Sequence, residues 1–334
     1  MRIALDAMGG DHAPHEVVMG AVEALKKEPD CEVLLVGRKA EIEAVLDAEN
    51  PDIDRDRLPI LHAEEVIGMD EKPVDALRRK KDNSITKALG AVRQGAADAV
   101  VSAGNTGAVV GGATLLWKLI PGVRRAGIAV PLGTRGNSSI VIDVGANIHC
   151  KPRHLLHYGM MASIYSEHVL GETKPRIALL NIGSEDSKGN TLVRETQQLF
   201  EAAPLNFIGH CEGGDIFEKK ADVIVCEGFV GNVVLKVSEG LAETMHKQFE
   251  DIVGDHVSSH ENSGMAEHIK KFRRATDYAE IGGGALLGVN GICIISHGRS
   301  GRRAIGNAIS LAAKFVRADA PSKIEAGVDA LRVE

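Results

Sequence analysis

Residues 94–110 have the sequence QGAADAVVSAGNTGAVV, which contains in order a short apolar run, a glycine turn and the first residues of an apolar helix. The run at 98–102 is mostly apolar and does not alternate with polar residues, which is typical of a strand buried on both faces of a sheet. Gly104 and Gly107 permit the tight turn that follows. The stretch therefore predicts one strand–turn–helix unit of a parallel sheet covered by helices.

The same alternation extends in both directions along the chain. Further strands are predicted at residues 2–6, 32–36, 139–143, 176–181, 206–209, 222–226 and 291–296. Helices are predicted at 15–27, 84–94, 153–170, 191–201, 232–249 and 302–316, with Ser84 as an N-cap and Gly95 as a C-terminal stop. Because no repeat or flexible linker interrupts this pattern, we predict a single α/β domain over residues 1–334 with a mainly parallel sheet.

Residues 250–280 are polar and helical in pattern, without a strand, and predict a helical hairpin that projects from the sheet. In its second half Met265, Ile269 and Phe272 recur at helical spacing and form a short apolar stripe. Four cations accompany this stripe, namely Lys270, Lys271, Arg273 and Arg274. We expect these seven residues to contact a membrane surface, mainly through charge.

Composition excludes several classes of function. The chain has 39 Lys and Arg against 46 Asp and Glu, a net charge of −7, which argues against a nucleic-acid-binding protein. Aromatic residues make up only 3% of the chain, too few to suggest platforms that stack on bases or sugars. The 5 cysteines form no CxxC pair, so we expect a reducing, cytoplasmic setting rather than a disulfide framework.

Five predicted strands end in an acid, an amide or a serine close to a glycine turn. The residues singled out in these loops are Asp6, Gly9, Gly10, Asp11, His12, Gly104, Asn105, Thr106, Asp143, Asn147, Lys188, Asn190, Gly231 and Asn232. His297, at the end of the last strand, joins them. Loops at the carboxyl ends of strands in open α/β sheets form ligand sites, and glycine turns followed by helix N-termini suit an anion such as phosphate.

Several catalytic motifs are absent from the sequence. No dinucleotide fingerprint, phosphate-binding P-loop or G-x-S-x-G elbow occurs, so neither a nucleotide cofactor nor an acyl-serine intermediate is indicated. The histidine pairs His12/His15 and His154/His157 lack convergent carboxylates or cysteines, so no metal is expected. His154 and His157 are predicted to lie on a helix surface.

Six motifs together resemble a known family. They are DAMGGDHAP at 6–14, the stretch at 94–110 quoted above, DVGAN at 143–147, NIGSEDSKGN at 181–190, CEGFVGNVVLKVSEG at 226–240 and GGGALLGVNGICIISHGRS at 282–300. Their content and order resemble the bacterial phosphate acyltransferases of phospholipid synthesis, over nearly the whole chain. The resemblance implies transfer of a long-chain acyl group from acyl carrier protein to inorganic phosphate, without a cofactor.

The resemblance also implies a three-layer α/β/α fold like that of the isocitrate and isopropylmalate dehydrogenases. It implies a homodimer in the cytoplasm that contacts the membrane peripherally and supplies acyl phosphate to a membrane glycerol-3-phosphate acyltransferase. Lys188 is expected to neutralise phosphate, and Asn232 with the Gly231 loop to hold phosphate or the oxyanion. Asp6, Asp11, Asp143 and Asn147 are expected to orient these groups.

Some assignments stay open at this point. His12 either protonates the departing thiolate or is a hydrogen-bonded loop histidine, and His297 is equally ambiguous. An acyl-CoA-dependent phosphotransacetylase, a dehydrogenase of the isocitrate type and a non-catalytic sensor of phosphorylated ligands are the alternative functions. A dehydrogenase would need paired aspartates for a divalent metal, for which the sequence has no clear signature.

Overall fold

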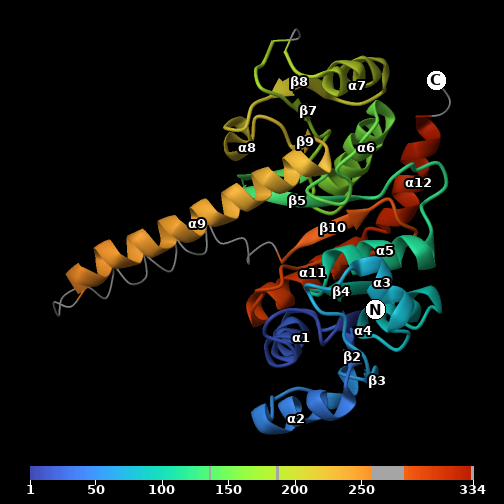
Figure 1. Cartoon of the computed structure of the whole chain (residues 1–334), viewed down its shortest axis with the longest axis vertical. Helices are drawn as coiled ribbons and strands as arrows, with labels where there is room; N and C mark the ends of the chain where they lie inside the picture. Colours follow the sequence, from blue (N-terminus) through green and yellow to red (C-terminus); the bar gives the residue numbers. More distant parts are fainter. Residues whose placement is uncertain (135–136, 186–187, 258–281, 332–334) are drawn as a thin grey trace.

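The computed structural model describes residues 1–134, 137–185, 188–257 and 282–331 (Figure 1). These residues build one continuous sheet with helices on both faces. The strands are β1 (Arg2–Asp6), β2 (Glu32–Gly37), β3 (Ile60–His62), β4 (Ala99–Ser102), β5 (Gly127–Thr134), β6 (Asn137–Ile142), β7 (Ile177–Leu180), β8 (Phe207–Cys211), β9 (Val223–Val225), β10 (Gly284–Leu287) and β11 (Cys293–Ile295). All eight predicted strands are present in the structure.

The sheet of the described residues has the strand order β3-β2-β1-β4-β11-β10-β5-β6-β9-β7-β8. The pairs β11–β10, β10–β5 and β5–β6 are antiparallel, and the other neighbours are parallel, which confirms a mainly parallel sheet. Three successive reversals leave β6, β9 and β7 running opposite to β1, β4 and β11. The five predicted loops therefore do not all lie at one edge of the sheet.

The helices are α1 (His15–Lys27), α2 (Lys39–Glu49), α3 (Pro73–Arg79), α4 (Ser84–Arg93), α5 (Thr106–Trp117), α6 (Pro152–His168), α7 (Thr191–Ala202), α8 (Asp215–Glu218), α9 (Gly228–Val257), α11 (Arg302–Arg317) and α12 (Ala320–Ala330), with a 3₁₀ turn at Arg55–Arg57. Gly95 follows α4 with φ +72°, as expected of a C-terminal stop. The N-cap prediction is wrong by one residue, because the Asn83 side chain, rather than Ser84, accepts from the Thr86 backbone N–H.

Alternate residues of each central strand face different cores. Ile3 and Leu5 of β1 belong to the core beneath α1, α6 and α11, whereas Ala4 belongs to the core beneath α4 and α5. The same division recurs in β4, β6 and β7. Because each strand buries both faces, the sheet is the middle of three layers, and the predicted α/β/α architecture is confirmed.

Helix α9 leaves the body of the molecule and projects to one side (Figure 1). Its 30 residues correspond to a length of about 45 Å at the usual rise per residue. The predicted hairpin at 250–280 therefore begins inside this helix, and residues 258–281 lie outside the described part of the chain. The seven residues predicted to contact a membrane are all in that segment.

Among the described residues, no helix combines the length and the apolarity that crossing a bilayer requires.

Candidate functional site

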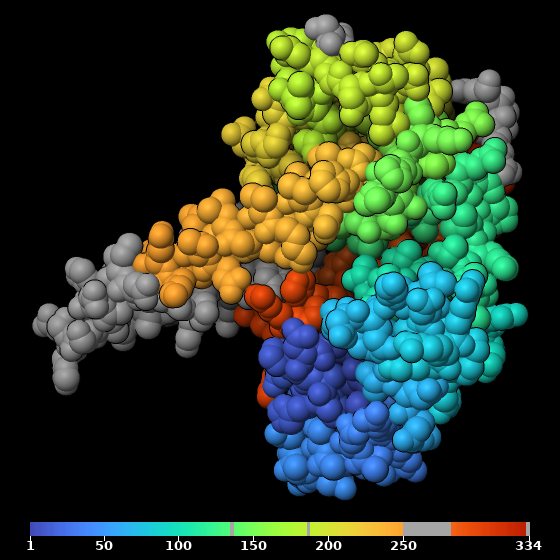
Figure 2. Space-filling view, in the orientation of Figure 1, coloured from blue at the N-terminus to red at the C-terminus, as the bar shows by residue number. Residues whose placement is uncertain are grey.

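A cavity with a volume of about 740 Å³ lies against the first half of α9. Its floor is formed by β5 and the start of β10, and its rim by the loops that follow β1, β4, β6 and β11. In the space-filling view, the orange root of α9 adjoins the green surface near residue 150, above the teal and cyan surface of α5 and α3 (Figure 2). The loops of both halves of the sheet thus reach one cavity, although their strands run in opposite directions.

Four of the predicted site residues line this cavity: Asp11, Thr106, Asn232 and His297. Asp11 follows β1, and its backbone N–H donates to the carbonyl of Gly298 at 2.7 Å, which joins the first loop to the last. Thr106 begins α5, and Asn232 lies in the first turns of α9. The prediction that Asn232 opens this helix is wrong, since α9 begins at Gly228. The backbone N–H groups of Phe229 and Val230 donate to the Glu227 carboxylate, which caps the helix.

Asp6 supports the cavity from beneath rather than lining it. The carboxylate is buried and accepts a 2.7 Å hydrogen bond from the Ser102 hydroxyl, which connects β1 with β4. Burial raises the pKa of Asp6, and the hydrogen bonds that its carboxylate accepts, first among them the one from Ser102, oppose this rise. A Cβ at Gly9 would lie 2.5 Å from Asp6 Oδ2 and one at Gly104 would lie 3.0 Å from it, so both glycines permit this close packing. Asp6 therefore fixes the shape of two loops.

Asn105 and Gly10 also shape the rim. The Asn105 side chain accepts from the Ala108 N–H, which caps α5, and its amide donates to the carbonyls of Gly68, Met69 and Glu71. Gly10 has φ +100°, and a Cβ there would lie 2.9 Å from the Gly298 carbonyl oxygen. These residues hold neighbouring loops together at the opening of the cavity.

Asp143 organises the loop after β6 in the same manner. Its buried carboxylate accepts hydrogen bonds from the backbone N–H groups of Ile128, Gly145, Ala146 and Asn147, at 2.8–3.1 Å. Burial raises the pKa of Asp143, whereas these backbone donors lower it. The neighbouring Asn147 amide donates to the Ala126 carbonyl and to the Tyr158 hydroxyl. The loop brings Gly145 into the cavity wall.

Gly231 lets α9 rest on this loop. A Cβ at Gly231 would lie only 2.0 Å from the Asp143 carbonyl oxygen, and one at Gly228 would lie 2.5 Å from the Asn147 carbonyl oxygen. The Gly228 N–H donates to that same Asn147 oxygen at 2.8 Å. The two glycines thus fix where the first turn of α9 meets the sheet.

The structure places three predicted residues away from the cavity wall. Lys188 is exposed in the loop after β7, where the Asn181 amide donates to its backbone carbonyl. Asn190 caps α7 by accepting from the Val193 N–H at 3.0 Å. The His12 side chain is exposed beside Asp11. None of the three is among the residues that line the cavity.

The prediction that His154 and His157 lie on a helix surface is wrong for His157. His157 is only 6% exposed, because α12 packs over α6 at this position. His154 is half-buried, and its Nδ1 accepts from the Lys151 backbone N–H at the start of α6.

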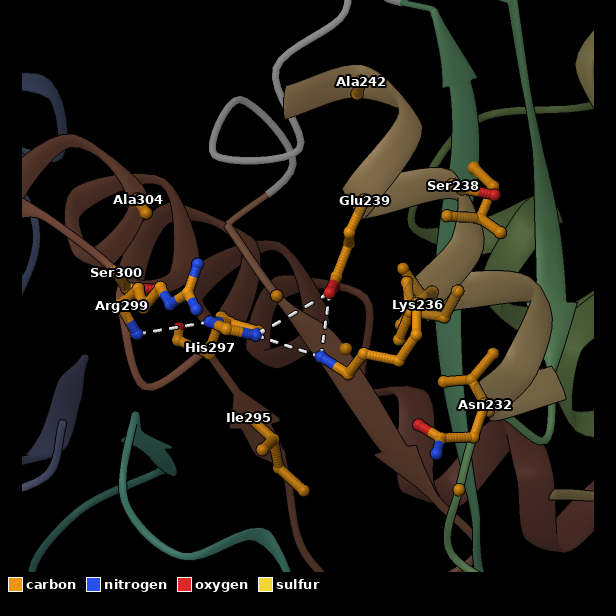
Figure 3. Close-up of a pocket in the computed structure, with 18 of the residues that line it drawn as sticks. Asn232, Lys236, Ser238, Glu239, Ala242, Ile295, His297, Arg299, Ser300 and Ala304 are labelled. Atoms are coloured by element: carbon orange, nitrogen blue, oxygen red, sulfur yellow. Dashed lines mark hydrogen bonds and ion pairs between the residues drawn. The ribbon is translucent and has the colours of Figure 1, made fainter. Parts of the chain in front are cut away.

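Lys236 and Glu239 were not predicted, although they lie at the centre of the site (Figure 3). Lys236 Nζ is 2.8 Å from Glu239 Oε2 and 3.0 Å from His297 Nε2, and His297 Nε2 is 3.7 Å from the same carboxylate oxygen. The spacing of Asn232, Lys236 and Glu239 at i, i+4 and i+7 places them on one face of α9. Since Asn232 was already a candidate, this spacing could have identified Lys236 and Glu239 from the sequence.

Both ring nitrogens of His297 have a polar neighbour. Nδ1 lies 3.2 Å from the Arg299 backbone nitrogen, and Nε2 lies 3.0 Å from Lys236 Nζ. Because a neutral imidazole accepts at only one nitrogen, it accepts a hydrogen bond from only one of these two donors. Burial lowers the pKa of His297, and the positive charge of Lys236 lowers it further, whereas Glu239 raises it. The ammonium group of Lys236 and the imidazole of His297 lie side by side at this end of the cavity, and a cation beside a polar ring suits an anionic oxygen.

The remaining wall is apolar and suits a hydrocarbon chain. Ile128, Val130 and Leu132 of β5 face Leu235 and Leu241 of α9 across the cavity. The cavity thus combines a polar end, with Lys236, His297 and Asn232, and an apolar remainder. A polar head joined to an apolar tail fits this arrangement.

Among the described residues, Glu28, Asp30 and Cys31 have the spacing of a metal site. Both carboxylates already accept from Arg317, at 2.7 and 2.8 Å, and none of the three lines the cavity. The arrangement is explained by this ion pair.

Comparisons with known proteins agree with the geometry. The sequence pattern of a family described as "Fatty acid synthesis protein" matches residues 1–323. A phosphate acyltransferase of Desulforudis audaxviator is 42% identical over 333 residues, covering 99% of this chain and 97% of that protein. One of Heliobacterium modesticaldum is 48% identical over 325 residues, covering 95% of this chain and 94% of the relative.

Solved structures share the fold. A phosphotransacetylase from Streptococcus pyogenes superposes with a TM-score of 0.62 at 18% identity, covering 95% of this chain and 94% of the other. A 4-hydroxythreonine-4-phosphate dehydrogenase from Klebsiella pneumoniae gives a TM-score of 0.52 at 15% identity, with 95% and 98% coverage. These likenesses confirm the predicted dehydrogenase-like fold.

Proposed function

Because the chain belongs to the fatty acid synthesis protein family and is an acyltransferase that uses phosphate, we propose that it moves a long-chain acyl group from acyl carrier protein to inorganic phosphate. The observation that carries this proposal is the cavity itself. Its polar end presents Lys236, His297 and Asn232, and its apolar wall extends between α9 and β5. Phosphate fits the first part and an acyl chain the second.

The reaction balances without a cofactor. A phosphate oxygen of HPO₄²⁻ attacks the thioester carbonyl carbon and forms a tetrahedral oxyanion. Collapse of this intermediate breaks the C–S bond, and the proton lost by phosphate ends on the departing thiol. The products are acyl phosphate and free carrier protein. Since phosphate is already a nucleophile, the enzyme needs to orient the substrates and stabilise charge more than it needs a strong base.

We assign Lys236 and the His297 imidazole to the phosphate or the oxyanion, with the Asn232 amide beside them. A preorganised donor to an oxyanion contributes roughly 3 kcal/mol to catalysis. Holding both substrates in line contributes about 7–11 kcal/mol more through proximity. Glu239 holds the Lys236 ammonium group in position when phosphate is absent.

Residues around the cavity have positioning roles in this proposal. Asp6, Gly9, Gly104 and Asn105 fix the loops after β1 and β4. Asp143, Asn147 and Gly231 fix the base of α9. Gly10, Asp11 and Thr106 form the rim. Lys188, from the loop after β7, remains assigned to the phosphate charge, Asn190 caps the helix next to it, and His12 is a proton donor for the thiolate.

The proposal extends to assembly and location. We propose a cytoplasmic homodimer that contacts the membrane peripherally and delivers acyl phosphate to a membrane glycerol-3-phosphate acyltransferase. The support is the series of exposed apolar residues on α9, which includes Val233, Val237, Leu241 and Met245 at 46%, 63%, 59% and 49% exposure, the last three of which also line the cavity. Because these residues recur at every fourth position, they lie on one side of the helix and form an apolar stripe of the kind that binds a partner.

The test offers two acyl donors side by side. Purified protein is incubated with phosphate and either long-chain acyl carrier protein or the matching acyl-CoA, and acyl phosphate is trapped with hydroxylamine. We expect acyl phosphate from the carrier-protein donor. Product from acyl-CoA alone would instead support the phosphotransacetylase alternative, and absence of product from both would overturn the proposal.

A further inference from the structure

Four cations surround the start of α6 and form what we call the α6 basic surface: Arg124, Arg125, Lys151 and Arg153. All four are exposed. From residue 118 to residue 166 the sequence contains a single acidic residue, Asp143, and this carboxylate is fully buried. In a chain whose net charge is −7, this surface is a marked local excess of positive charge.

The charges of this surface are not neutralised within the described part of the chain. Arg2, Arg176, Arg302 and Arg317 each bind a carboxylate, whereas the four cations of the α6 basic surface take part in no ion pair between described residues. These positive charges affect the neighbouring His154. Burial lowers the pKa of His154, and the charges of Arg125, Lys151 and Arg124 lower it further.

The surface also has apolar and concave features. Ile148, three residues before Lys151, is 60% exposed. A cavity of about 540 Å³ is lined by Arg124 and Arg153 together with Leu156, His157, Val328 and Leu331. An exposed aliphatic side chain close in sequence to these cations, and a hollow that two of them line, are features expected of a protein-binding site.

A short segment of chain joins this surface to the active cavity. Gly145 lines that cavity, and Lys151 follows it by six residues, which limits their separation to about 21 Å. The segment between them is tied to the root of α9, because the Gly228 N–H donates to the Asn147 carbonyl. In Figure 2 the green surface near residue 150 adjoins the orange root of α9.

On the basis of the proposed function, we propose that the α6 basic surface docks the acidic protein that carries the acyl group. Opposite charges would steer and orient the carrier so that its thioester-bearing arm enters the cavity past Gly145. An anionic membrane is the competing partner for a basic surface. A membrane-binding face presents a broad apolar stripe, whereas here Arg124 and Arg153 line a hollow and the exposed aliphatic residue close to Lys151 in sequence is Ile148.

The test reverses two charges at once, in the variant Arg124→Glu/Arg153→Glu. We expect the KM for acyl carrier protein to rise at least about tenfold and direct binding of the carrier, measured by fluorescence anisotropy, to weaken by a similar factor. The KM for phosphate and turnover with acyl-CoA or an acyl-pantetheine should not change. The matched control is Lys26→Glu/Lys314→Glu, which reverses two exposed cations on α1 and α11 and should leave carrier binding unchanged.

The outcomes distinguish failure of the docking site from failure of the proposed function. Unchanged carrier affinity in the Arg124→Glu/Arg153→Glu variant, with a normal melting temperature, overturns the docking site. Loss of binding to phosphatidylglycerol vesicles with unchanged carrier affinity overturns it in favour of a membrane. If the wild-type protein forms no acyl phosphate from any donor, the proposed function fails, and the anisotropy measurement still decides whether this surface binds the carrier.

Discussion

Lys236 is the residue on which the proposed chemistry depends most. Its side chain is 52% exposed and its known partners are Glu239 and His297, so little of the fold rests on it. We expect Lys236→Ala to lower kcat/KM for phosphate at least about tenfold, by removing a donor to the anion, with little change in melting temperature. Lys247→Ala, an exposed lysine further along α9, is the control. Equal kinetics in both variants would contradict the assignment.

Asn232 gives a second test at the same end of the cavity. Asn232→Asp keeps the size of the side chain but adds a negative charge where phosphate is proposed to bind. We expect the KM for phosphate to rise at least about tenfold through like-charge repulsion, while stability barely changes because Glu227 caps the helix. Asn50→Asp, at the exposed end of α2, should alter neither property. An unaltered KM in Asn232→Asp would show that phosphate binds elsewhere.

Lys188 lies outside the cavity wall, so its role is tested by kinetics alone. We expect Lys188→Ala to lower turnover at least about tenfold, mainly at subsaturating phosphate, if the loop after β7 supplies charge to the anion as proposed. Its exposure predicts an unchanged melting temperature. Near-normal rates at low phosphate, like those of Lys247→Ala, would leave Lys236 and His297 as the proposed phosphate-binding residues.

Sequence reasoning found the loops of the site better than its helical residues. Asp11, Thr106 and His297 lie close after strands and line the cavity as such residues should, and Asn232 lies near the start of the helix after β9. Lys236 and Glu239 lie further along that helix, where charged residues are normally solvated, and only the position of α9 beside the cavity brings them into the site. Asp6 and Asp143 were recognised as important, but their burial beneath the loops depends on tertiary contacts that no local pattern shows.

The root of α9 allows a matched pair of glycine substitutions at the scale of one element. Gly231→Ala places a Cβ 2.0 Å from the Asp143 carbonyl oxygen, so we expect a clear fall in unfolding free energy and in activity as the helix is displaced. At Gly240, in the same helix, a Cβ would meet nothing within 4 Å. Gly240→Ala should therefore stabilise the protein by up to about 1 kcal/mol, as alanine does in helices. Urea unfolding measures both, and a stable, active Gly231→Ala would contradict the packing described.

Three strands, β3, β5 and β10, were not predicted from the sequence, each for a physical reason. β5 contains Pro131 and begins with a glycine, and proline normally argues against an interior strand. β10 has four residues next to a glycine tract, and β3 has three residues, both too short for a periodic signal. The start of α9 was placed too late because Gly228 and Gly231 are poor helix formers, retained here for close contact with the loop after β6.

At the scale of the whole molecule, Glu16 links the first helix to α11 through Arg302, 286 residues later. The hydrogen bonds from Arg302 lower the pKa of Glu16 from 4.5 to about 2. Between these values the unfolded chain binds more protons, so the stabilisation is fully present above pH 4.5 and is lost as the pH falls towards 2. We expect Glu16→Gln to lower the unfolding free energy near neutral pH and to flatten this acid dependence.

The control for this measurement is Glu41→Gln, which removes an exposed ion pair with Arg38. Such pairs contribute little, so its stability should follow that of the wild type at each pH. Denaturant unfolding between about pH 7 and about pH 3 compares the three proteins. If Glu16→Gln retained the full acid dependence of the wild type, another carboxylate would be responsible.

The general architecture could be predicted because the central strands bury both faces, which leaves apolar runs in the sequence. The reversal of direction at β10, β5 and β6 could not, since antiparallel pairing in the middle of the sheet depends on how two halves of the chain meet. That reversal decides which loops face one another, and so the composition of the site.

The pairing of β4 with β11 also bears on how the chain is synthesised. β1, β2 and β4 emerge from the ribosome within the first 102 residues, but β11 completes their half of the sheet only at residues 293–295, and α11 covers α1 later still. The nascent N-terminal portion therefore carries an open strand edge and an uncovered apolar face through most of translation. Chaperone binding during synthesis, and aggregation of chains truncated before β11, are the consequences expected of this order.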